Sequence, residues 1–216
     1  MTTVLVALLL SLAQDTPLTI RFIGNESFEI SDGKTTLLTD YPYRPGAFGY
    51  MMYDPKPIRP RGNVILLITH EHLDHFDATQ QRDTSWKIIA PRSVTRSLTG
   101  ALAIPLDSLI TIHGLTIRPI LTNHGPIEHH SYLVRWGRLR LYLSGDTDEP
   151  TELLDQENLD YAFVSPWLYS TIVKSGRAIP AHRVIIYHHR KDEQIPNCRG
   201  CWIPKQGESI TTVGNE

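Results

Sequence analysis

The order of apolar and polar positions along the 216-residue chain predicts β-strands more often than helices. Residues 18–24, 27–31 and 34–40 are apolar or alternating, and Gly or Asp-Gly turns separate them, as in an antiparallel meander. Residues 63–68 form a continuous apolar run, which is typical of a strand covered on both faces. The N-terminal part of the fold should therefore be a sheet.

The rest of the chain predicts further strands with short helices between them. We expect strands at 86–91, 115–122, 160–166 and 183–189, and a hairpin over 131–147 that turns at Trp136-Gly137. Short helical patterns cover residues 77–82, 93–102, 150–157 and 169–176. No repeat or low-complexity segment divides the chain, so the pattern indicates one α/β domain.

Composition excludes some classes of partner. The chain has 41% hydrophobic and 20% charged residues and a formal net charge of −2, which is ordinary for a globular protein. Its Lys and Arg residues are scattered without a basic block, so we expect no nucleic-acid partner and favour a small-molecule ligand. The ten histidines are the one unusual count.

The N-terminal residues predict export. Residues 4–12 are apolar apart from Ser11, and the small residues Ser11 and Ala13 stand where a signal peptidase would need them. We expect a signal peptide over residues 1–13 and a single domain over 14–216, which places the mature protein in the periplasm or outside the cell. The alternative is a buried first strand in a cytoplasmic protein. A segment of nine residues is too short to span a bilayer, so no stable membrane span is expected.

The two cysteines, Cys198 and Cys201, form an isolated CxxC pair. A zinc site of this kind would need two more ligands, and no second CxxC exists. In an oxidising compartment the pair favours a small local disulfide. The sequence leaves its role open.

The segment "THEHLDH" contains potential metal ligands and comes directly after the apolar run 63–68. Imidazole and carboxylate ligands together suit borderline divalent metals. In an extended segment His70 and His72 face the same side, and the following loop can turn Asp74 and His75 towards a second ion. One short segment can therefore supply ligands to two adjacent sites.

"ITHEHLDHF" (68–76) resembles the signature of the metallo-β-lactamase superfamily. "RFIGNESFEI" with "LLTD", and "LYLSGDTD", resemble the branch that includes the L-ascorbate 6-phosphate lactonases. The resemblance implies an α/β fold, the four-layered αββα sandwich. One departure is visible, because many members read Gly-His where this chain reads Gly24-Asn25.

The resemblance also implies a set of metal ligands. For the first ion these are His70, His72 and a third histidine, for which we favour His124 over His129 and His130. For the second ion they are Asp74, His75 and a histidine after strand 183–189, where we favour His188 over His189. Asp146, after Gly145, would bridge both ions. His130 is a candidate for contact with a ligand residue or the substrate.

The resemblance implies hydrolysis. Two divalent ions about 3.5 to 4 Å apart, zinc first with manganese or iron as alternatives, would activate a water, with Asp74 as the catalytic residue that orients it. The bond cleaved would be an ester, lactone, amide or phosphodiester. The Tyr- and Pro-rich residues 41–60 and the pair Trp167 and Tyr169 are candidate walls of the cleft. The alternatives are an iron-dependent redox enzyme and a non-catalytic metal-binding protein, and the oligomeric state is open.

Overall fold

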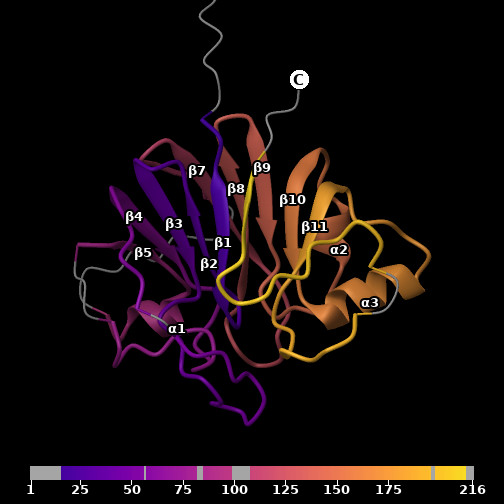
Figure 1. The fold of residues 1–216 in the computed structure, drawn as a ribbon, viewed down its shortest axis with the longest axis horizontal. Helices are drawn as coiled ribbons and strands as arrows, with labels where there is room; N and C mark the ends of the chain where they lie inside the picture. The colour runs from indigo at the N-terminus through magenta and orange to yellow at the C-terminus, as the bar shows by residue number, and fades with distance from the viewer. Residues whose placement is uncertain (1–15, 56, 82–84, 99–107, 196–197, 213–216) are drawn as a thin grey trace, which may run out of the picture.

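Two six-stranded β-sheets form the core of the protein in a computed structural model that describes residues 16–55, 57–81, 85–98, 108–195 and 198–212 (Figure 1). The first sheet has the strand order β12-β1-β2-β3-β4-β5. Its strands are β1 (Thr19–Gly24), β2 (Ser27–Ser31), β3 (Thr35–Thr39), β4 (Asn63–Leu67), β5 (Lys87–Ile89) and β12 (Ser209–Thr211). The expected signal peptide lies outside the described residues and stays a prediction.

The second sheet has the strand order β11-β10-β9-β8-β7-β6. Its strands are β6 (Ile110–Ile112), β7 (Leu115–Leu121), β8 (His130–Trp136), β9 (Leu139–Leu143), β10 (Leu159–Val164) and β11 (Ala181–Ile186). The meander β6 to β9 is antiparallel, whereas β9, β10 and β11 run parallel. In the first sheet, β3, β4 and β5 are the parallel strands.

Three hydrophobic clusters hold four layers together. The largest lies between the sheets, and Phe28 of β2 stacks edge-on against Phe163 of β10 within it. A second cluster joins the outer face of β9 to β11 to α2 (Thr151–Leu154) and α3 (Pro166–Lys174). The third joins β3 to β5 to α1 (Arg92–Thr95). The predicted αββα sandwich is confirmed, with thin helical layers.

The differences from the predicted elements are local. The three-residue strands β6 and β12 were not predicted, because so few residues show no alternation. No helix forms over the described residues 77–81, where the Asp77 carboxylate accepts hydrogen bonds from Thr79 and Gln80 and stabilises a turn instead. The predicted helix 93–102 begins as α1, and its second half lies outside the described residues.

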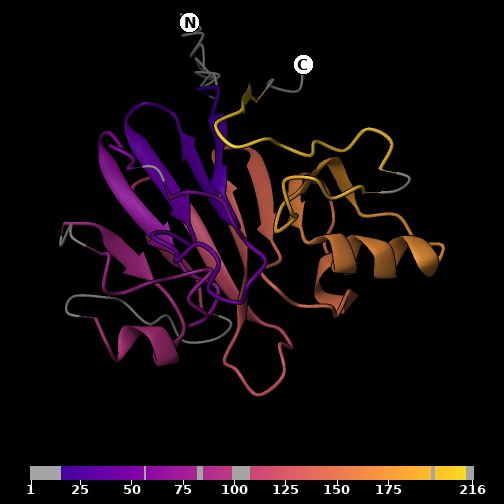
Figure 2. The same ribbon diagram turned by 60° about the horizontal axis from the view of Figure 1, so that its bottom comes forward.

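The parallel strands of both sheets end at the same edge of the sandwich. In Figure 1 this is the lower edge, where the long connections gather, and Figure 2 turns it towards the viewer. Ligand sites of layered α/β proteins form where parallel strands end. The residues after β4, β9 and β11, which contain the histidine segments and Asp146, therefore lie together.

The loop after β3 is anchored to this edge. Tyr43 is fully buried, and the amide of Asp77 donates a hydrogen bond of 2.6 Å to the carbonyl of Pro42. Arg44 Nε lies 3.0 Å from Asp77 Oδ2. These contacts keep the exposed part of the loop, around Phe48 and Tyr50, close to the strand ends.

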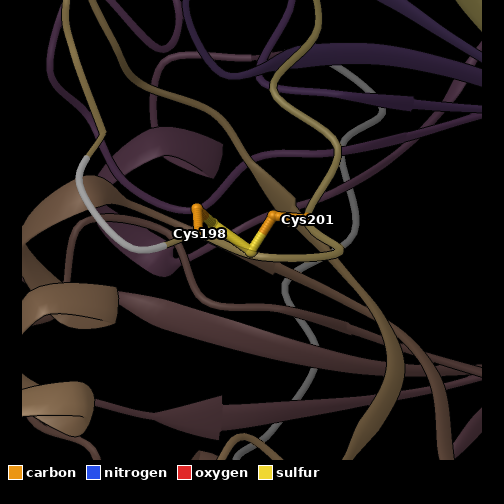
Figure 3. Close-up of a disulfide and its surroundings, with 2 residues drawn as sticks. All are labelled: Cys198 and Cys201. Atoms are coloured by element: carbon orange, nitrogen blue, oxygen red, sulfur yellow. A yellow bond between two sulfur atoms is a disulfide. The ribbon is translucent and has the colours of Figure 1, made fainter.

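Cys198 and Cys201 form a disulfide in the segment after β11, as expected (Figure 3). Trp202 follows it, accepts a hydrogen bond from the amide of Ile186 and donates one to the carbonyl of Val184. The disulfide therefore closes a loop that packs along β11. In the part of the chain that the structure describes, every helix is too short or too polar to cross a bilayer.

We expect Asp77→Asn to lower the free energy of unfolding by about 1 kcal/mol at pH 7, since half-exposed Arg44 is partly screened by water. Burial alone would raise the pKa of Asp77, but hydrogen bonds from Gln80, Thr79 and Arg44 lower it to about 2. A lowered pKa stabilises the fold fully above the ordinary value of 3.8, and the effect is lost as the pH falls towards 2. Urea unfolding with chelator present should give a difference in the free energy of unfolding between wild type and Asp77→Asn. This difference should be constant from pH 5 to 8 and should shrink below pH 4. A difference that does not change with pH would contradict this account.

Candidate metal centre

Three histidine side chains converge where β4 and β7 end. His70 Nε2 lies 2.8 Å from His72 Nδ1, and His124 Nε2 lies 3.4 Å from the same atom. Each offers one ring nitrogen, and these nitrogens and a carboxylate oxygen of Asp146 all lie within 4.8 Å of one another. Three imidazoles and one carboxylate form a donor set that suits a divalent metal.

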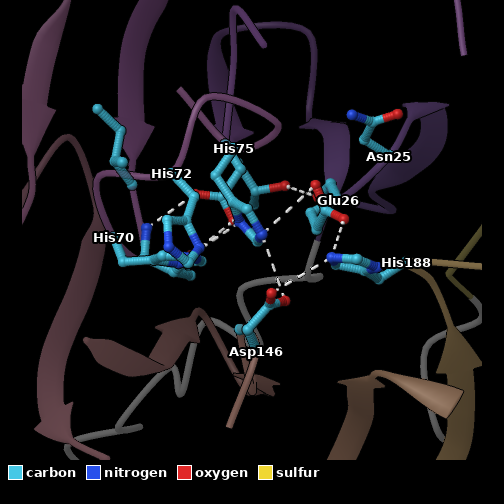
Figure 4. Close-up of polar contacts among 12 residues, drawn as sticks. Asn25, Glu26, His70, His72, His75, Asp146 and His188 are labelled. Atoms are coloured by element: carbon cyan, nitrogen blue, oxygen red, sulfur yellow. Dashed lines mark hydrogen bonds and ion pairs between the residues drawn. The ribbon is translucent and has the colours of Figure 1, made fainter. Parts of the chain in front are cut away.

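A second group of donors shares Asp146 with the first. It consists of Glu26, His75, Asp146 and His188, whose donor atoms also lie within 4.8 Å of one another (Figure 4). Nε2 of His188 is 2.8 Å from Glu26 Oε1 and 3.3 Å from Asp146 Oδ2. Nε2 of His75 is 3.3 Å from Asp146 Oδ1. Asp146 therefore lies between two groups that could each hold one ion.

Several donor atoms of the second group are buried and make no hydrogen bond. They are both carboxylate oxygens of Glu26, Nε2 of His75 and Oδ1 of Asp146; Oδ1 of nearby Asp74 is in the same state. Leaving a buried polar atom unpaired costs about 1 to 3 kcal/mol. A cation among them would satisfy several at once, so these residues fit a bound metal.

A tight turn orients the side chain of Asp146 towards both donor groups. Gly145 follows β9 with φ of +60°, a left-handed conformation that glycine adopts without strain. The amide of Asp146 donates a hydrogen bond of 2.9 Å to His129 Nε2, and the Thr122 hydroxyl bonds His129 Nδ1 at 2.8 Å. Both nitrogens of His129 are therefore engaged, Nε2 by the Asp146 amide and Nδ1 by the Thr122 hydroxyl.

The histidines that the sequence left as alternatives lie in different surroundings. His124 belongs to the first group, whereas His129 holds the Asp146 backbone. His188 belongs to the second group, whereas His189 Nδ1 lies 3.3 Å from the Tyr53 hydroxyl. His130 Nε2 lies 3.7 Å from a carboxylate oxygen of Glu128. The arrangement agrees with the preferences for His124 and His188, whose role as ligands stays a proposal.

Asp40 was not singled out in the sequence, but it orients the histidine segment. Its carboxylate accepts hydrogen bonds from the amide and hydroxyl of Thr69, at 2.7 and 3.0 Å, and lies 3.1 Å from His75 Nδ1. The Thr69 hydroxyl in turn lies 3.0 Å from His70 Nδ1. Such contacts fix imidazole rings with the other nitrogen free for a metal.

Glu26 is a candidate donor that sequence reasoning missed, and it is the fourth member of the second group, for which Asp74 was predicted as a ligand. Asp74 is close, with Oδ2 3.7 Å from His188 Nε2 and 3.5 Å from the Tyr50 hydroxyl, but it lies outside the group defined by the 4.8 Å limit. The signal was the Gly24-Asn25 departure, since Glu26 is the next residue. Asn25 Nδ2 donates to the Asp74 carbonyl at 3.0 Å and joins the two segments.

The two groups differ in electrostatics. Burial, reinforced by His75, moves the pKa of His70 far below its ordinary value. Burial alone would lower the pKa of His188 too, but Asp146 and Glu26 outweigh it and raise the pKa to about 10. Burial raises the pKa of Glu26 to about 7, against the opposing effect of His188 and His75. Carboxylates therefore raise the pKa of an imidazole in the second group, whereas burial lowers the pKa of His70 in the first.

Aromatic side chains surround the centre. The ring of Phe48 lies 5.1 Å from that of His72, and those of Tyr50 and Trp167 lie 5.6 and 4.7 Å from that of His188. Phe48 and Tyr50 are exposed, as expected for a cleft wall. Tyr43 and Tyr53 from the same predicted wall are buried in the core instead, and Tyr41 packs partly buried against it. Tyr169 lines a pocket of about 390 Å³ beside Trp167.

Comparisons with known proteins agree with this architecture. The sequence profile of the beta-lactamase superfamily domain matches residues 19–164. A proposed metal-dependent hydrolase from Parabacteroides distasonis is 24% identical, with a TM-score of 0.67 over 87% of this chain and 91% of its own. The metallo-beta-lactamase fold protein YhfI from Bacillus subtilis is 15% identical, with a TM-score of 0.69 over 91% of this chain and 100% of its own.

A more distant similarity involves CmlA, a diiron β-hydroxylase from Streptomyces venezuelae. It is 14% identical, with a TM-score of 0.52 over 79% of this chain and 44% of its own. At these identities the solved structures show a shared fold. A search among curated protein sequences finds no significant match. The resemblance to the L-ascorbate 6-phosphate lactonases stays a prediction.

We expect Gly145→Ala to disturb the centre, because a Cβ there would lie 2.3 Å from His129 Nε2. The contact should displace Asp146, lower the free energy of unfolding by about 1 to 3 kcal/mol and reduce bound metal. Gly114→Ala is the matched control, since Gly114 also has a positive φ, of +85°, but a Cβ there meets nothing within 4 Å. Thermal unfolding and metal content of both variants would test this. Equal metal loss in the two would contradict the proposed contact.

Proposed function

Because the chain belongs to the beta-lactamase superfamily domain family, we propose that it is a hydrolase that uses two divalent ions to activate water. The observation that carries this proposal is the pair of donor groups joined by Asp146. The proposed ligands are His70, His72, His124, Asp74, His75, Asp146 and His188, with zinc as the first choice and manganese or iron as alternatives.

The ions would supply a water of lowered pKa and positive charge opposite the oxygen of the bond that breaks. The chain's residues do the remaining work. Asp40 and Thr69 hold the rings of His75 and His70 in place. His129 keeps the backbone of Asp146 in position between the two groups.

Asp74 is proposed as the residue that orients the water and accepts its proton. Its carboxylate is buried at the edge of the second group, and Oδ1 makes no hydrogen bond. Oδ2 faces the hydroxyl of Tyr50 in the exposed loop. A carboxylate at the edge of the second group and next to the cleft supports the proposed role of Asp74 as general base.

The cleft favours an uncharged substrate, so we propose an ester or lactone over a phosphodiester. The two divalent ions would offset the charge of the carboxylates Glu26, Asp74 and Asp146, so the preference rests on the residues that line the cleft. Arg44 in the nearby loop is paired with Asp77. The exposed aromatic rim suits an apolar acyl or ring portion.

We also propose that the mature protein is exported, so that it works in the periplasm or outside the cell. The disulfide between Cys198 and Cys201 supports this, because disulfides persist in oxidising compartments. N-terminal sequencing of the protein expressed with its own first residues tests the proposal. Cleavage after Ala13 supports it, and an intact N-terminus opposes it.

A hydrolase screen over lactones, acyl esters and phosphodiesters, with zinc, manganese and iron supplied in turn, tests the function. Turnover that chelator abolishes and metal restores supports the proposal. Metal analysis should find close to two ions per chain and few in Asp146→Ala. A fully folded wild-type protein that binds no metal opposes it.

A redox enzyme that uses iron is the second candidate, because the diiron β-hydroxylase CmlA has a similar fold. The hydrolase is preferred, since the matched family and most donors here are also compatible with zinc. Oxygen consumption by the iron-loaded protein, with no hydrolysis by any metal form, would favour the redox enzyme.

We expect Asp74→Asn to lower kcat by about 10²- to 10⁴-fold, because it removes the proposed proton acceptor. Glu71→Gln is the matched control, since Glu71 lies in the same segment but is exposed. Steady-state kinetics on the best substrate of the screen, with metal content measured in parallel, would show this. If the decrease in kcat is fully explained by a decrease in bound metal, Asp74 acts in metal binding alone.

We expect Tyr50→Phe to lower kcat/KM about tenfold, because it removes a hydroxyl that lies 3.4 Å from His188 Nε2 and 3.5 Å from Asp74 Oδ2. Tyr41→Phe is the matched control, because Tyr41 packs partly buried against the core away from this rim. Kinetics of both variants at saturating metal would measure the difference. Unchanged kcat/KM in Tyr50→Phe would show that the ring alone matters.

A further inference from the structure

Glu26 lies at the second donor group, although it was not expected there. Its side chain enters from the turn between β1 and β2 and points towards His75 and His188 (Figure 4). Oε1 is 2.8 Å from His188 Nε2, and Oε2 is 3.7 Å from His75 Nε2. The residue is only 1% exposed. The carboxylate therefore faces the same space as the two imidazoles.

The backbone holds Glu26 in this position from several directions. Its carbonyl accepts a hydrogen bond of 2.8 Å from the Thr39 hydroxyl. The preceding Asn25 has φ of 51°, and its carbonyl accepts the amide of His188 at 3.1 Å. The following Ser27 hydroxyl donates to the Asp40 carbonyl. A turn fixed in this way cannot easily move the carboxylate out to solvent.

Both oxygens of Glu26 are buried, and apart from the close approach of His188 Nε2 to Oε1 neither has a hydrogen-bond partner. Burying a charge is unfavourable unless it is paired and hydrogen-bonded or coordinates a metal. The imidazole of His188 is near enough for an ion pair, but one carboxylate oxygen stays unused. A bound cation would interact with the carboxylate oxygen that has no partner.

The donor atoms of the two groups therefore differ in kind. The first contains three imidazoles and Asp146, which is mainly a nitrogen set. The second contains two imidazoles, Asp146 and Glu26, and Asp74 lies 3.7 Å from His188. Carboxylates favour manganese and other hard ions, whereas imidazole suits zinc and iron.

We propose that Glu26 is a ligand of the second ion and makes this site less selective for Zn²⁺ over Mn²⁺ than the first. The inference rests on the proposed two-metal centre and adds a ligand and a metal preference to it. Zinc binds nitrogen and oxygen sites more tightly than manganese in general, so the claim concerns the difference between the two sites. A centre with one Zn²⁺ and one Mn²⁺ follows when zinc is limiting.

A purely structural role for Glu26 makes a different prediction. If Glu26 only orients His188, Glu26→Gln should preserve the site, because the amide oxygen still accepts a hydrogen bond from the ring. If Glu26 is a ligand, loss of its charge should weaken the second ion and spare the first. Glu29→Gln is the matched control, since Glu29 lies three residues further on and pairs with Arg21 away from the centre.

The experiment loads metal-free protein with one equivalent of Zn²⁺ and then titrates Mn²⁺, with free Mn²⁺ measured by electron paramagnetic resonance. Wild type and Glu29→Gln should bind one Mn²⁺ per chain. Glu26→Gln should bind it at least tenfold more weakly while retaining its Zn²⁺. Competition of Zn²⁺ for the second site should show a smaller preference for zinc in wild type than in Glu26→Gln.

Mn²⁺ affinity of Glu26→Gln within threefold of wild type would overturn the inference and leave the two-metal hydrolase intact. Absence of any bound metal in wild type would oppose the centre itself, which is a separate result. Thermal unfolding checks that the variants fold. If Glu26→Gln does not fold, Glu26→Asp replaces it, because the shorter carboxylate should also weaken Mn²⁺ selectively; unchanged binding would overturn the inference.

Discussion

The position of one carboxylate, Asp146, determines how the centre is organised. It is the only member common to both donor groups of the described residues, so its place decides whether the histidines of the two sheets form one centre. Three conditions set that place: the end of β9, the left-handed turn at Gly145, and the hydrogen bond from its amide to His129. All three act on the backbone of Asp146, so its carboxylate faces His75 through Oδ1 and His188 through Oδ2.

Around Asp146 the fold buries carboxylates and imidazoles at an unfavourable cost in solvation, and much of that cost is not offset by hydrogen bonds. Asp40 is the exception, because Thr69 and His75 satisfy it. A buried carboxylate whose oxygens are hydrogen-bonded orients its neighbours, whereas a buried carboxylate with an oxygen that lacks a partner is available to bind a metal ion. This contrast separates Asp40 from Glu26, although both are acidic and both lie beside His75.

The loop after β3 shows why composition alone could not identify the cleft. Tyr43, Phe48, Tyr50 and Tyr53 are similar in chemistry and lie close together in sequence, yet Tyr43 and Tyr53 fill the core while Phe48 and Tyr50 are exposed over the histidines. Contacts with residues distant in sequence, such as that between Arg44 and Asp77, 33 positions apart, hold this loop beside the centre. No local pattern of residues contains that information.

The sequence by itself determined most of the strands and predicted most members of the two donor groups, because apolar periodicity and the spacing "HEHLDH" are local properties. It also distinguished His124 and His188 by their place just after a strand. Only the tertiary structure decided that Glu26, from a turn at the start of the fold, meets His188, from its end. Contacts between residues 162 positions apart depend on how two sheets pack face to face, which no short stretch of sequence encodes.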